Sequence, residues 1–412
     1  MYPISIKKNR SILIIKALLV FLLCSTMVVF PRETFQASLR GFNAWLTLVF
    51  PALLPFFIMS ELLMGLGVVH FMGVLLEPIM RPVFNVPGTG AFVMAMGYTS
   101  GAPIGTMLSV ELRKKNLCTR MEAERLMSFT NNSSPLFIFG AVAVGMFNNP
   151  ALGLILAFSH YSANLIVGIL LRFFGERDHQ KINDIDNKKG LLITRALKAL
   201  MEAQVSDGRP FGTLLADSIK KSVQTLTLIG GFIILFSVIT EIISTLGIMD
   251  LFIDAIILLI KPLGMDSNAA PALAVGFFEI TLGIKSASES EILLPLQLIA
   301  ASAIMGWGGL SIHAQVASLA KGTDIRMKTY ISARIMHSLI SALIMFLSMG
   351  SAAPAITNLF ETHQSMVGIF SGGWAAVVLP MVFFLAICFL GILASLLIYL
   401  CRSFNLIFIN KR

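Results

Sequence analysis

The sequence has few charged residues and few cysteines, and each shortage excludes a class of protein. Only 13% of the 412 residues are charged, about half of the 25% that is usual in soluble domains. The four cysteines are scattered in or beside apolar segments, so they predict neither a disulfide framework nor a metal site. The motifs of zinc proteases, serine hydrolases and P-loop enzymes do not occur. We therefore expect no catalytic residues, no cofactor and no metal, and we interpret the chain as a non-enzyme.

Apolar sequence is abundant instead. Apolar residues make up 56% of the chain, and they fall in blocks of about twenty, the length that crosses a bilayer. We predict an all-α, multi-pass protein of the cell membrane, with about 8–12 spanning or re-entrant helices. Its net charge of +9 is best explained by basic cytoplasmic loops, so we expect the lipid bilayer and no nucleic acid as a partner.

The basic residues are distributed unevenly between the two sides of the membrane. Threading the apolar segments in order places 26 of the 31 on one side, and only Arg32, Arg40, Arg81 and Lys285 fall clearly opposite. The positive-inside rule makes that side cytoplasmic, with both chain termini on it. The apolar run at 12–30 is interpreted as a retained anchor, and a cleaved signal peptide is the less favoured alternative.

The chain repeats itself. Residues 59–68 resemble residues 239–248, and residues 98–101 resemble residues 280–283. Each half holds five apolar segments, and the basic loops change places between the halves, which predicts two inverted-topology repeats as in transporters. A chance alignment of similar apolar helices is the alternative. The predicted organisation is an N-terminal membrane anchor helix (1–40), a first repeat (41–174), a cytoplasmic linker (175–221), a second repeat (222–350), and a C-terminal membrane helix and tail (351–412).

Four clusters of Gly, Pro, Asn and Ser interrupt apolar segments, at 97–105, 131–135, 279–286 and 306–315. In lipid a helix unwinds only where protein or a wet cavity satisfies its backbone, and paired interruptions indicate a transporter binding site. The free N–H groups after a break favour an anion, although close packing of small residues is the alternative. The candidate solute-binding residues are Thr99, Ser100, Asn131, Asn132, Ser133, Ser134, Glu279, Thr281, Lys285, Ser311, His313 and Gln315.

Two carboxylates, Glu61 and Glu241, occupy equivalent positions in the repeats. Ionisable groups within a membrane are costly, so these two are candidates for coupling transport to a proton or cation, with an interfacial position or a hydrogen bond across the repeat axis as the alternative. Arg334 lies beside a basic loop, and contact with lipid headgroups is the role expected for it.

The motifs at the breaks resemble a known family. The sequences LLPFF at 53–57, GYTSGAP at 97–103, TNNSSPLF at 130–137 and GGLSIHAQ at 308–315 are similar to those of sporulation integral membrane proteins of the YlbJ (SpoVV) family. More broadly, they are similar to gate or nucleoside-recognition domains. The resemblance covers about residues 10–400.

The resemblance implies a sporulation transporter that moves dipicolinic acid (pyridine-2,6-dicarboxylate) from the mother cell across the outer forespore membrane. Dipicolinate is then the expected solute, carried by alternating access between the two repeats. The residues alone indicate only a small anionic solute, and they leave a homo-oligomer open. A permease for nucleosides or other small metabolites is one alternative, and a non-transporting membrane scaffold is the other.

Overall fold

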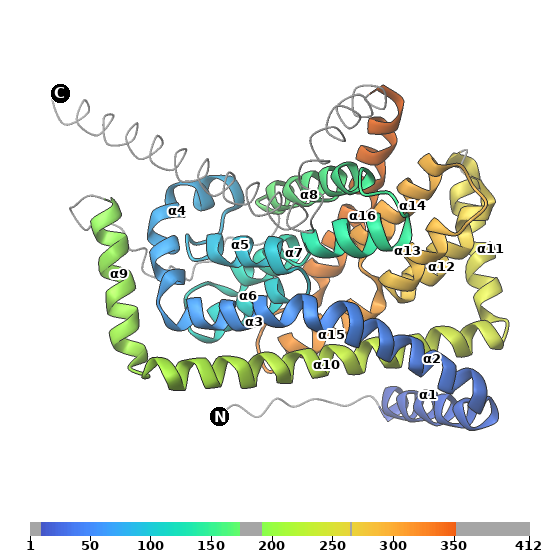
Figure 1. Ribbon diagram of the computed structural model, residues 1–412, viewed down its shortest axis with the longest axis horizontal. Helices are drawn as coiled ribbons and strands as arrows, with labels where there is room; N and C mark the ends of the chain where they lie inside the picture. The colour runs from blue at the N-terminus through green and yellow to red at the C-terminus, as the bar shows by residue number, and fades with distance from the viewer. Residues whose placement is uncertain (1–9, 174–191, 264–265, 352–412) are drawn as a thin grey trace.

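The computed structural model describes residues 10–173, 192–263 and 266–351, and within these ranges the chain is helical with no strand (Figure 1). Four of the described helices are long and apolar enough to cross a membrane, or up to six spans exist if each bent pair counts as one. The all-helical membrane fold predicted from the sequence is therefore confirmed. The polar stretch at 175–191 and the C-terminal helix expected near 376–400 lie outside the described residues.

Two long antiparallel arms cross the molecule side by side. The first consists of α2 (Pro31–Ala44), the π-helical turn η1 (Trp45–Val49) and α3 (Phe50–Gly65), and the second is α10 (Phe211–Thr245). Trp45 donates to the Leu226 carbonyl oxygen at 2.9 Å, and the Ser237 hydroxyl donates to the Ala37 carbonyl oxygen at 2.8 Å. The anchor helix α1 (Arg10–Val29) precedes the first arm at a bend of 104°, where Pro31 begins α2.

A short helix turns sharply away from the end of each arm. Gly67 and Gly247 make these turns with left-handed φ values of 77° and 71°, a conformation that costs a glycine little. The helices that follow are α4 (Val68–Phe84) and α11 (Ile248–Ile260). They lie at opposite ends of the arms, with α9 (Leu192–Asp207) beside α4 (Figure 1).

Each half of the chain then forms a helical hairpin. The first consists of α5 (Gly90–Ser100) and α6 (Ile104–Lys114), and the second of α12 (Ala270–Phe278) and α13 (Ile280–Ser288). A Cβ atom on Gly283 of α13 would lie 2.2 Å from the Cα atom of Gly276 in α12, so these two helices pack back to back with no room for a side chain. The apolar segments that contain the predicted interruptions at 97–105 and 279–286 are therefore hairpins and not single continuous helices.

A broken helix and a continuous helix complete each half. In the first half these are α7 (Arg120–Thr130) with the π-helical η2 (Leu136–Met146), followed by α8 (Leu152–Leu171). In the second they are α14 (Leu294–Trp307) with α15 (Gly309–Ala320), followed by α16 (Met327–Ser351). Two short 3₁₀ turns, η3 (Lys261–Leu263) and η4 (Ser267–Ala269), lead into the second hairpin. The order of elements is thus the same in both halves, which supports the inverted repeat, although that topology stays a prediction.

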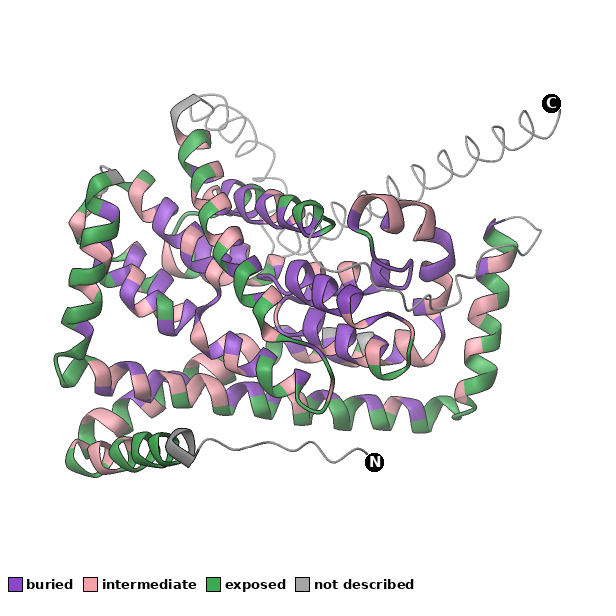
Figure 2. Ribbon diagram, turned by 180° about the vertical axis from the view of Figure 1, so that it is seen from behind, coloured by how far each residue is buried: buried purple, intermediate pink, exposed green. Residues whose placement is uncertain are grey.

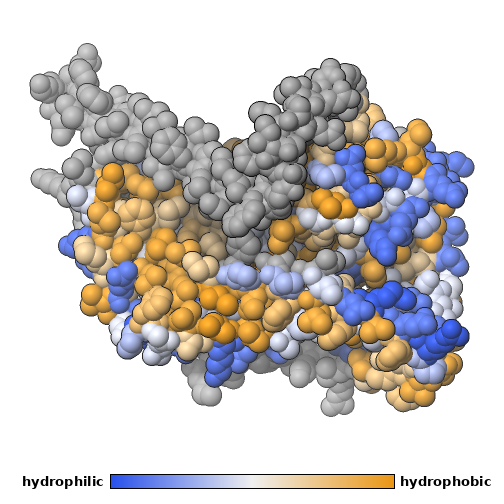
Figure 3. All heavy atoms as spheres, viewed as in Figure 1, coloured by the Kyte–Doolittle hydropathy of each residue, from blue (hydrophilic) through white to orange (hydrophobic). Residues whose placement is uncertain are grey.

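Burial follows this arrangement. Buried residues concentrate in α5 to α8, whereas α1 is largely exposed and α10 is exposed over part of its surface (Figure 2). The exposed residues of α10 include large apolar side chains such as Leu228 and Leu235, and apolar side chains spread over the middle of the face seen in Figure 3. An apolar exterior of this kind is what a lipid-facing surface requires.

Two predicted domain boundaries fall inside helices. The anchor was expected to end at residue 40 and the linker at residue 221, but these points lie inside α2 and α10. The helices continue past the apolar layer, since Asp217, Lys220 and Lys221 belong to the first turns of α10. Hydropathy marks where a helix meets lipid, and it does not mark where the helix begins. The predicted linker also contains the helix α9.

Ionic side chains from both halves converge at one end of the molecule, which we call the basic end. Glu61, Lys115, Arg209 and Lys221 line one hollow of about 210 Å³ there. Residues of α6 and α7 pair with the loop after α15, Arg113 of α6 with Asp324 at 2.7 Å and Glu124 of α7 with Arg326 at 3.0 Å.

The basic end also includes Arg81, which pairs with Glu122. Threading had placed Arg81 on the opposite side, and that assignment was wrong. Because α5 and α6 form a hairpin, the chain enters and leaves on the same side, which reverses the side of α4.

Candidate functional site

The tip of the first hairpin lies against the break between α7 and η2. Ala102 donates its backbone N–H to the Asn132 carbonyl oxygen at 2.6 Å. A Cβ on Gly101, whose φ is 81°, would lie 2.7 Å from the Ser134 nitrogen. The Asn132 amide, oriented with its nitrogen toward α5, donates to the Gly97 carbonyl oxygen at 2.9 Å. The two interruptions predicted in the first half therefore meet.

The other candidate residues near this hairpin tip differ in their hydrogen bonding. The Thr99 hydroxyl donates to the Ala95 carbonyl oxygen of its own helix at 2.7 Å. The buried Ser100 hydroxyl has no partner in the described structure. Across the break, the Ser134 hydroxyl accepts from the Phe137 N–H at 3.2 Å and so caps the start of η2.

The second half repeats this arrangement with different side chains. Glu279 has extended backbone angles at the hairpin tip, and its carboxylate accepts from the Leu282 N–H at 2.7 Å and from Thr281. A Cβ on Gly309, at the break between α14 and α15, would lie 3.0 Å from the Ile280 nitrogen. Ser311 and Gln315 are buried in α15.

The two halves meet beside the break that contains Asn131. The Asn131 amide donates to the Tyr330 hydroxyl of α16 at 2.9 Å. The Tyr330 ring lies 5.3 Å from the ring of His313, which itself contacts the Gly309 carbonyl oxygen at 2.7 Å through Nδ1. Tyr330 thus connects the broken helix of the first half with that of the second.

Arg334 occupies the centre of this junction. Its guanidinium donates to the Asn131 carbonyl oxygen at 2.8 Å, to the Ser128 carbonyl oxygen at 2.5 Å and to the Asn164 side-chain oxygen at 3.2 Å. The residue is only 2% exposed. The prediction that Arg334 contacts lipid headgroups was wrong, because α16 turns this residue toward the protein interior, one turn after Tyr330.

No carboxylate of the described residues pairs with this buried cation, whose three hydrogen bonds go to neutral oxygens. The Nε atom of Arg334 and the side-chain oxygen of Asn131 have no partner there. The last carbonyls of α7 and the negative end of its dipole compensate part of the charge. A buried ion without a counter-ion still costs several kcal/mol. The site is therefore suited to a negatively charged ligand.

Further polar side chains surround Arg334. His160 Nε2 accepts from the Ser133 N–H at 3.0 Å, and the Tyr161 hydroxyl donates to the Ser133 carbonyl oxygen at 3.0 Å. Asn164 donates to the Tyr98 hydroxyl at 3.1 Å. The group we call the Arg334 cluster consists of Tyr98, Asn131, Ser133, His160, Tyr161, Asn164, Tyr330, Arg334 and His337.

Most of this cluster escaped prediction from the breaks alone, which identified only Asn131 and Ser133. A usable signal existed in the helices that flank them. Tyr330, Arg334 and His337 are spaced by four and three residues, as are His160 and Asn164 by four. Such spacing places polar groups on one face of an otherwise apolar helix.

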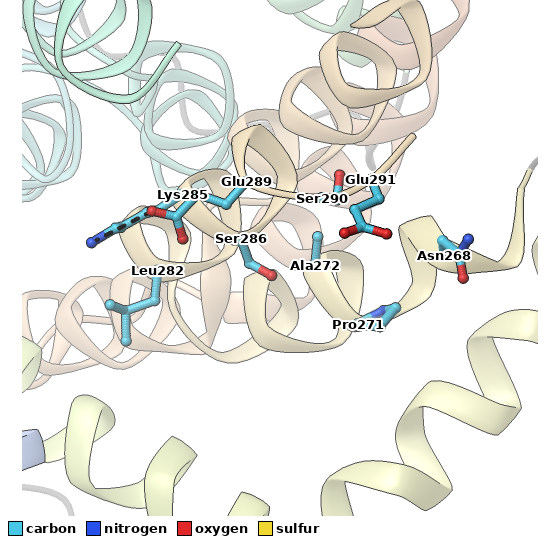
Figure 4. A pocket seen from close by; sticks show the side chains of 9 residues that line it. All are labelled: Asn268, Pro271, Ala272, Leu282, Lys285, Ser286, Glu289, Ser290 and Glu291. Carbon is cyan, nitrogen blue, oxygen red and sulfur yellow. Dashed lines mark ion pairs between the residues drawn. The ribbon is translucent and has the colours of Figure 1, made fainter. Parts of the chain in front are cut away.

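Lys285 lies apart from the other candidates. It is exposed on α13 and lies 3.8 Å from Glu289 in a surface hollow of about 570 Å³ (Figure 4). The positive charge expected at the breaks is therefore supplied by Arg334.

Glu61 and Glu241 lie near the ends of the two arms. Glu61 pairs with Lys221 at 3.0 Å and Glu241 with Arg40 at 2.5 Å. Lys221 and Glu241 are 20 residues apart on α10, roughly 30 Å along a helix, which matches the hydrocarbon thickness. The interfacial alternative therefore fits both carboxylates, and their coupling role stays a prediction. Within the described ranges no group of three His, Cys, Asp or Glu could hold a metal ion.

Comparison with known proteins relates this geometry to a family. The model of the Gate family, described as nucleoside recognition, matches residues 46–158, from η1 into α8. The sporulation integral membrane protein YlbJ of Bacillus subtilis (strain 168) is 46% identical over 329 residues, which is 79% of this chain and 80% of that protein. No solved structure matches. The chain therefore belongs to the family of the sporulation integral membrane protein YlbJ.

Proposed function

We propose that the chain is a sporulation transporter that carries dipicolinate across the outer forespore membrane, and that the Arg334 cluster binds the solute. The observation that carries this proposal is the buried guanidinium of Arg334, which has no carboxylate partner among the described residues. The family indicates sporulation, and the buried positive charge beside unwound backbone favours an anion.

The aromatic and polar groups of the cluster suit a planar dicarboxylate. One carboxylate accepts from the Arg334 guanidinium, which is a strong charge-assisted contact. The rings of Tyr98, Tyr161 and Tyr330 supply flat surfaces and hydroxyls beside it. A neutral nucleoside would leave the cation without a counter-ion.

Transport by alternating access requires two parts that move relative to each other. The contacts between hairpin tips and breaks stay largely within a half, Gly101 with Ser134 in one and Gly309 with Ile280 in the other. We propose that the halves rock about the Arg334 cluster, with the basic end on the cytoplasmic side of the membrane.

The test is solute flux by the purified protein in liposomes, comparing dipicolinate with uridine. We expect dipicolinate uptake to exceed uridine uptake, and Arg334→Gln to lower it at least tenfold. Lys285→Gln removes an equal charge outside the cluster and should leave uptake within twofold.

Arg334→Lys distinguishes the effect of the positive charge from that of the guanidinium hydrogen bonds, because lysine keeps the cation but loses the forked hydrogen bonds. It should retain more flux than Arg334→Gln if the charge binds solute. Uridine transport at an equal or greater rate favours a nucleoside permease, for which the Gate match speaks. Full dipicolinate flux in a folded Arg334→Gln protein rules out the site.

A further inference from the structure

Two buried histidines lie face to face beside Arg334. The rings of His160 on α8 and His337 on α16 have centroids 4.5 Å apart, and both residues are fully buried. His337 is three residues beyond Arg334 on the same helix, and His160 contacts the Ser133 N–H at the break. The histidine pair thus lies within the proposed binding site.

The hydrogen bonds fix which nitrogen of each neutral ring carries the proton. Because the His160 carbonyl oxygen can only accept, His337 Nε2 must donate to it at 2.9 Å, which leaves the lone pair on His337 Nδ1. Because the Ser133 N–H donates to His160 Nε2, the proton of His160 lies on Nδ1. Neither Nδ1 atom has a partner in the described structure.

The pair therefore offers one vacant proton-accepting position, His337 Nδ1, and one unused donor, His160 Nδ1–H. Protonation of His337 would place a second positive charge near Arg334 in a buried site, which is unfavourable while the site is empty. A bound dicarboxylate changes this balance. Its two negative charges exceed the single positive charge of Arg334, so the occupied site becomes neutral when it also takes up one proton.

The other titratable groups around the pair do not change the net charge of the site. The ring of His160 lies 5.5 Å from that of Tyr161 on α8, which in turn contacts Tyr98 on α5. Arg334 on α16 lies over the ring of Tyr330, through which His313 of α15 reaches the same junction. The side chains of α7 and α14 that contact α8 and α16 here are neutral, and Glu124 on α7 pairs with Arg326 at the basic end.

We propose, on the basis of the anion transport proposed above, that His160 and His337 form a proton-binding pair that takes up one proton with each dicarboxylate. The proton binds at His337 Nδ1, and solute and proton cross the membrane together. This coupling makes a proton gradient able to drive the solute, and it explains why two histidines are buried beside an arginine.

The test is dipicolinate binding to the full-length protein in weakly buffered detergent with a pH-sensitive dye. We expect uptake of about one proton per bound dicarboxylate, and an apparent Kd that rises with pH by up to about tenfold per unit between pH 6 and 8. In His337→Gln the amide keeps the donor to the His160 carbonyl oxygen but cannot titrate, so proton uptake should disappear and Kd should become independent of pH. His70→Gln on α4 is the matched control and should behave as the wild type.

The outcomes separate the two proposals. Failure of the wild type to bind or transport dipicolinate overturns the proposed function and the proton pair together. Dipicolinate binding without proton uptake, or proton uptake that persists in a folded His337→Gln protein, overturns only the proton pair.

Discussion

The two halves of the molecule have the same backbone arrangement, but the side chains around their breaks carry opposite charges. In each half a hairpin tip lies against a broken helix, Gly101 beside Ser134 and Gly309 beside Ile280. Amides, hydroxyls and the cation of Arg334, which α16 of the second half supplies, surround the break of the first half. The second half has a buried carboxylate, Glu279, at its tip and two glycines at its break.

This difference shows that backbone breaks create polar positions, whereas side chains decide what those positions bind. Glu279 is satisfied by the first turn of its own helix, α13, where the helix dipole stabilises a negative charge. Arg334 has no carboxylate partner in the part of the chain that the structure describes. The buried positive charge of the first break is therefore available to a ligand, and the buried negative charge of the second is already engaged.

The largest effect is expected at the glycines that allow close backbone contacts in each half. A Cβ on Gly97 would lie 2.2 Å from the Thr130 carbonyl oxygen, and one on Gly283 would lie 2.2 Å from the Gly276 Cα. We expect Gly97→Ala and Gly283→Ala each to destabilise the protein by about 2–3 kcal/mol, because backbone must move to admit the methyl group. Thermal unfolding in detergent measures this.

The control for both is Gly212→Ala, since a Cβ there meets no atom within 4 Å. It should leave the melting temperature unchanged or raise it slightly, because alanine favours a helix. If either hairpin glycine tolerates alanine, the contact that it tests, α5 with α7 for Gly97 or α12 with α13 for Gly283, is not as close as described.

A smaller effect is expected where the halves differ in how they cap a helix after a break. Glu279→Ala removes the acceptor of the Leu282 N–H, and Ser134→Ala removes that of the Phe137 N–H. We expect a loss of about 1–2 kcal/mol for either change. Glu279→Gln keeps an acceptor and should cost less than Glu279→Ala. A Glu279→Gln protein as unstable as Glu279→Ala would mean that charge, and not the cap, stabilises this tip.

The smallest effect is expected at the basic end, where Arg113 of α6 pairs with Asp324 in the loop after α15. The Arg113 guanidinium, through its hydrogen bonds, holds the pKa of Asp324 below its ordinary value. A lowered pKa in the folded state stabilises the protein above the ordinary carboxyl value near 3.9 and loses that contribution as pH falls through the lowered value.

The side chain of Asp324 is 47% exposed, so the contribution should stay below about 1 kcal/mol. Asp324→Asn should flatten the dependence of the melting temperature on pH below about pH 5. Lys285→Gln at the opposite end, where the partner Glu289 is 3.8 Å away, should leave that dependence unaltered. An identical pH dependence in wild type and Asp324→Asn would show that this pair adds no stability.

Several features of the site could be predicted because they are local. An interruption such as residues 131–134 shows in the sequence, since Asn, Ser and Pro break a helix wherever they cluster. The same holds for Gly101 and for the glycines at 308 and 309, whose φ values lie in the left-handed region. The contact between two breaks, in contrast, depends on how hairpins fold back, and hydropathy cannot distinguish a hairpin from a single crossing.

Arg334 illustrates the same limit. Its sequence neighbours include Lys321, Arg326 and Lys328, which suggested a membrane surface. Its spatial neighbours are Ser128, Asn131 and Asn164, all more than 160 residues away along the chain. A charge near the end of an apolar helix turns inward or outward according to helix rotation, and packing against other helices sets that rotation.

Apolar length and helix-breaking residues act locally, so they suffice to identify an all-helical membrane protein and the points at which its helices break. The folded arrangement of the helices was needed to learn which segments are hairpins, which breaks touch, and that a cation and two histidines share one buried junction. Those features follow from contacts between residues far apart in the chain, which no local pattern encodes.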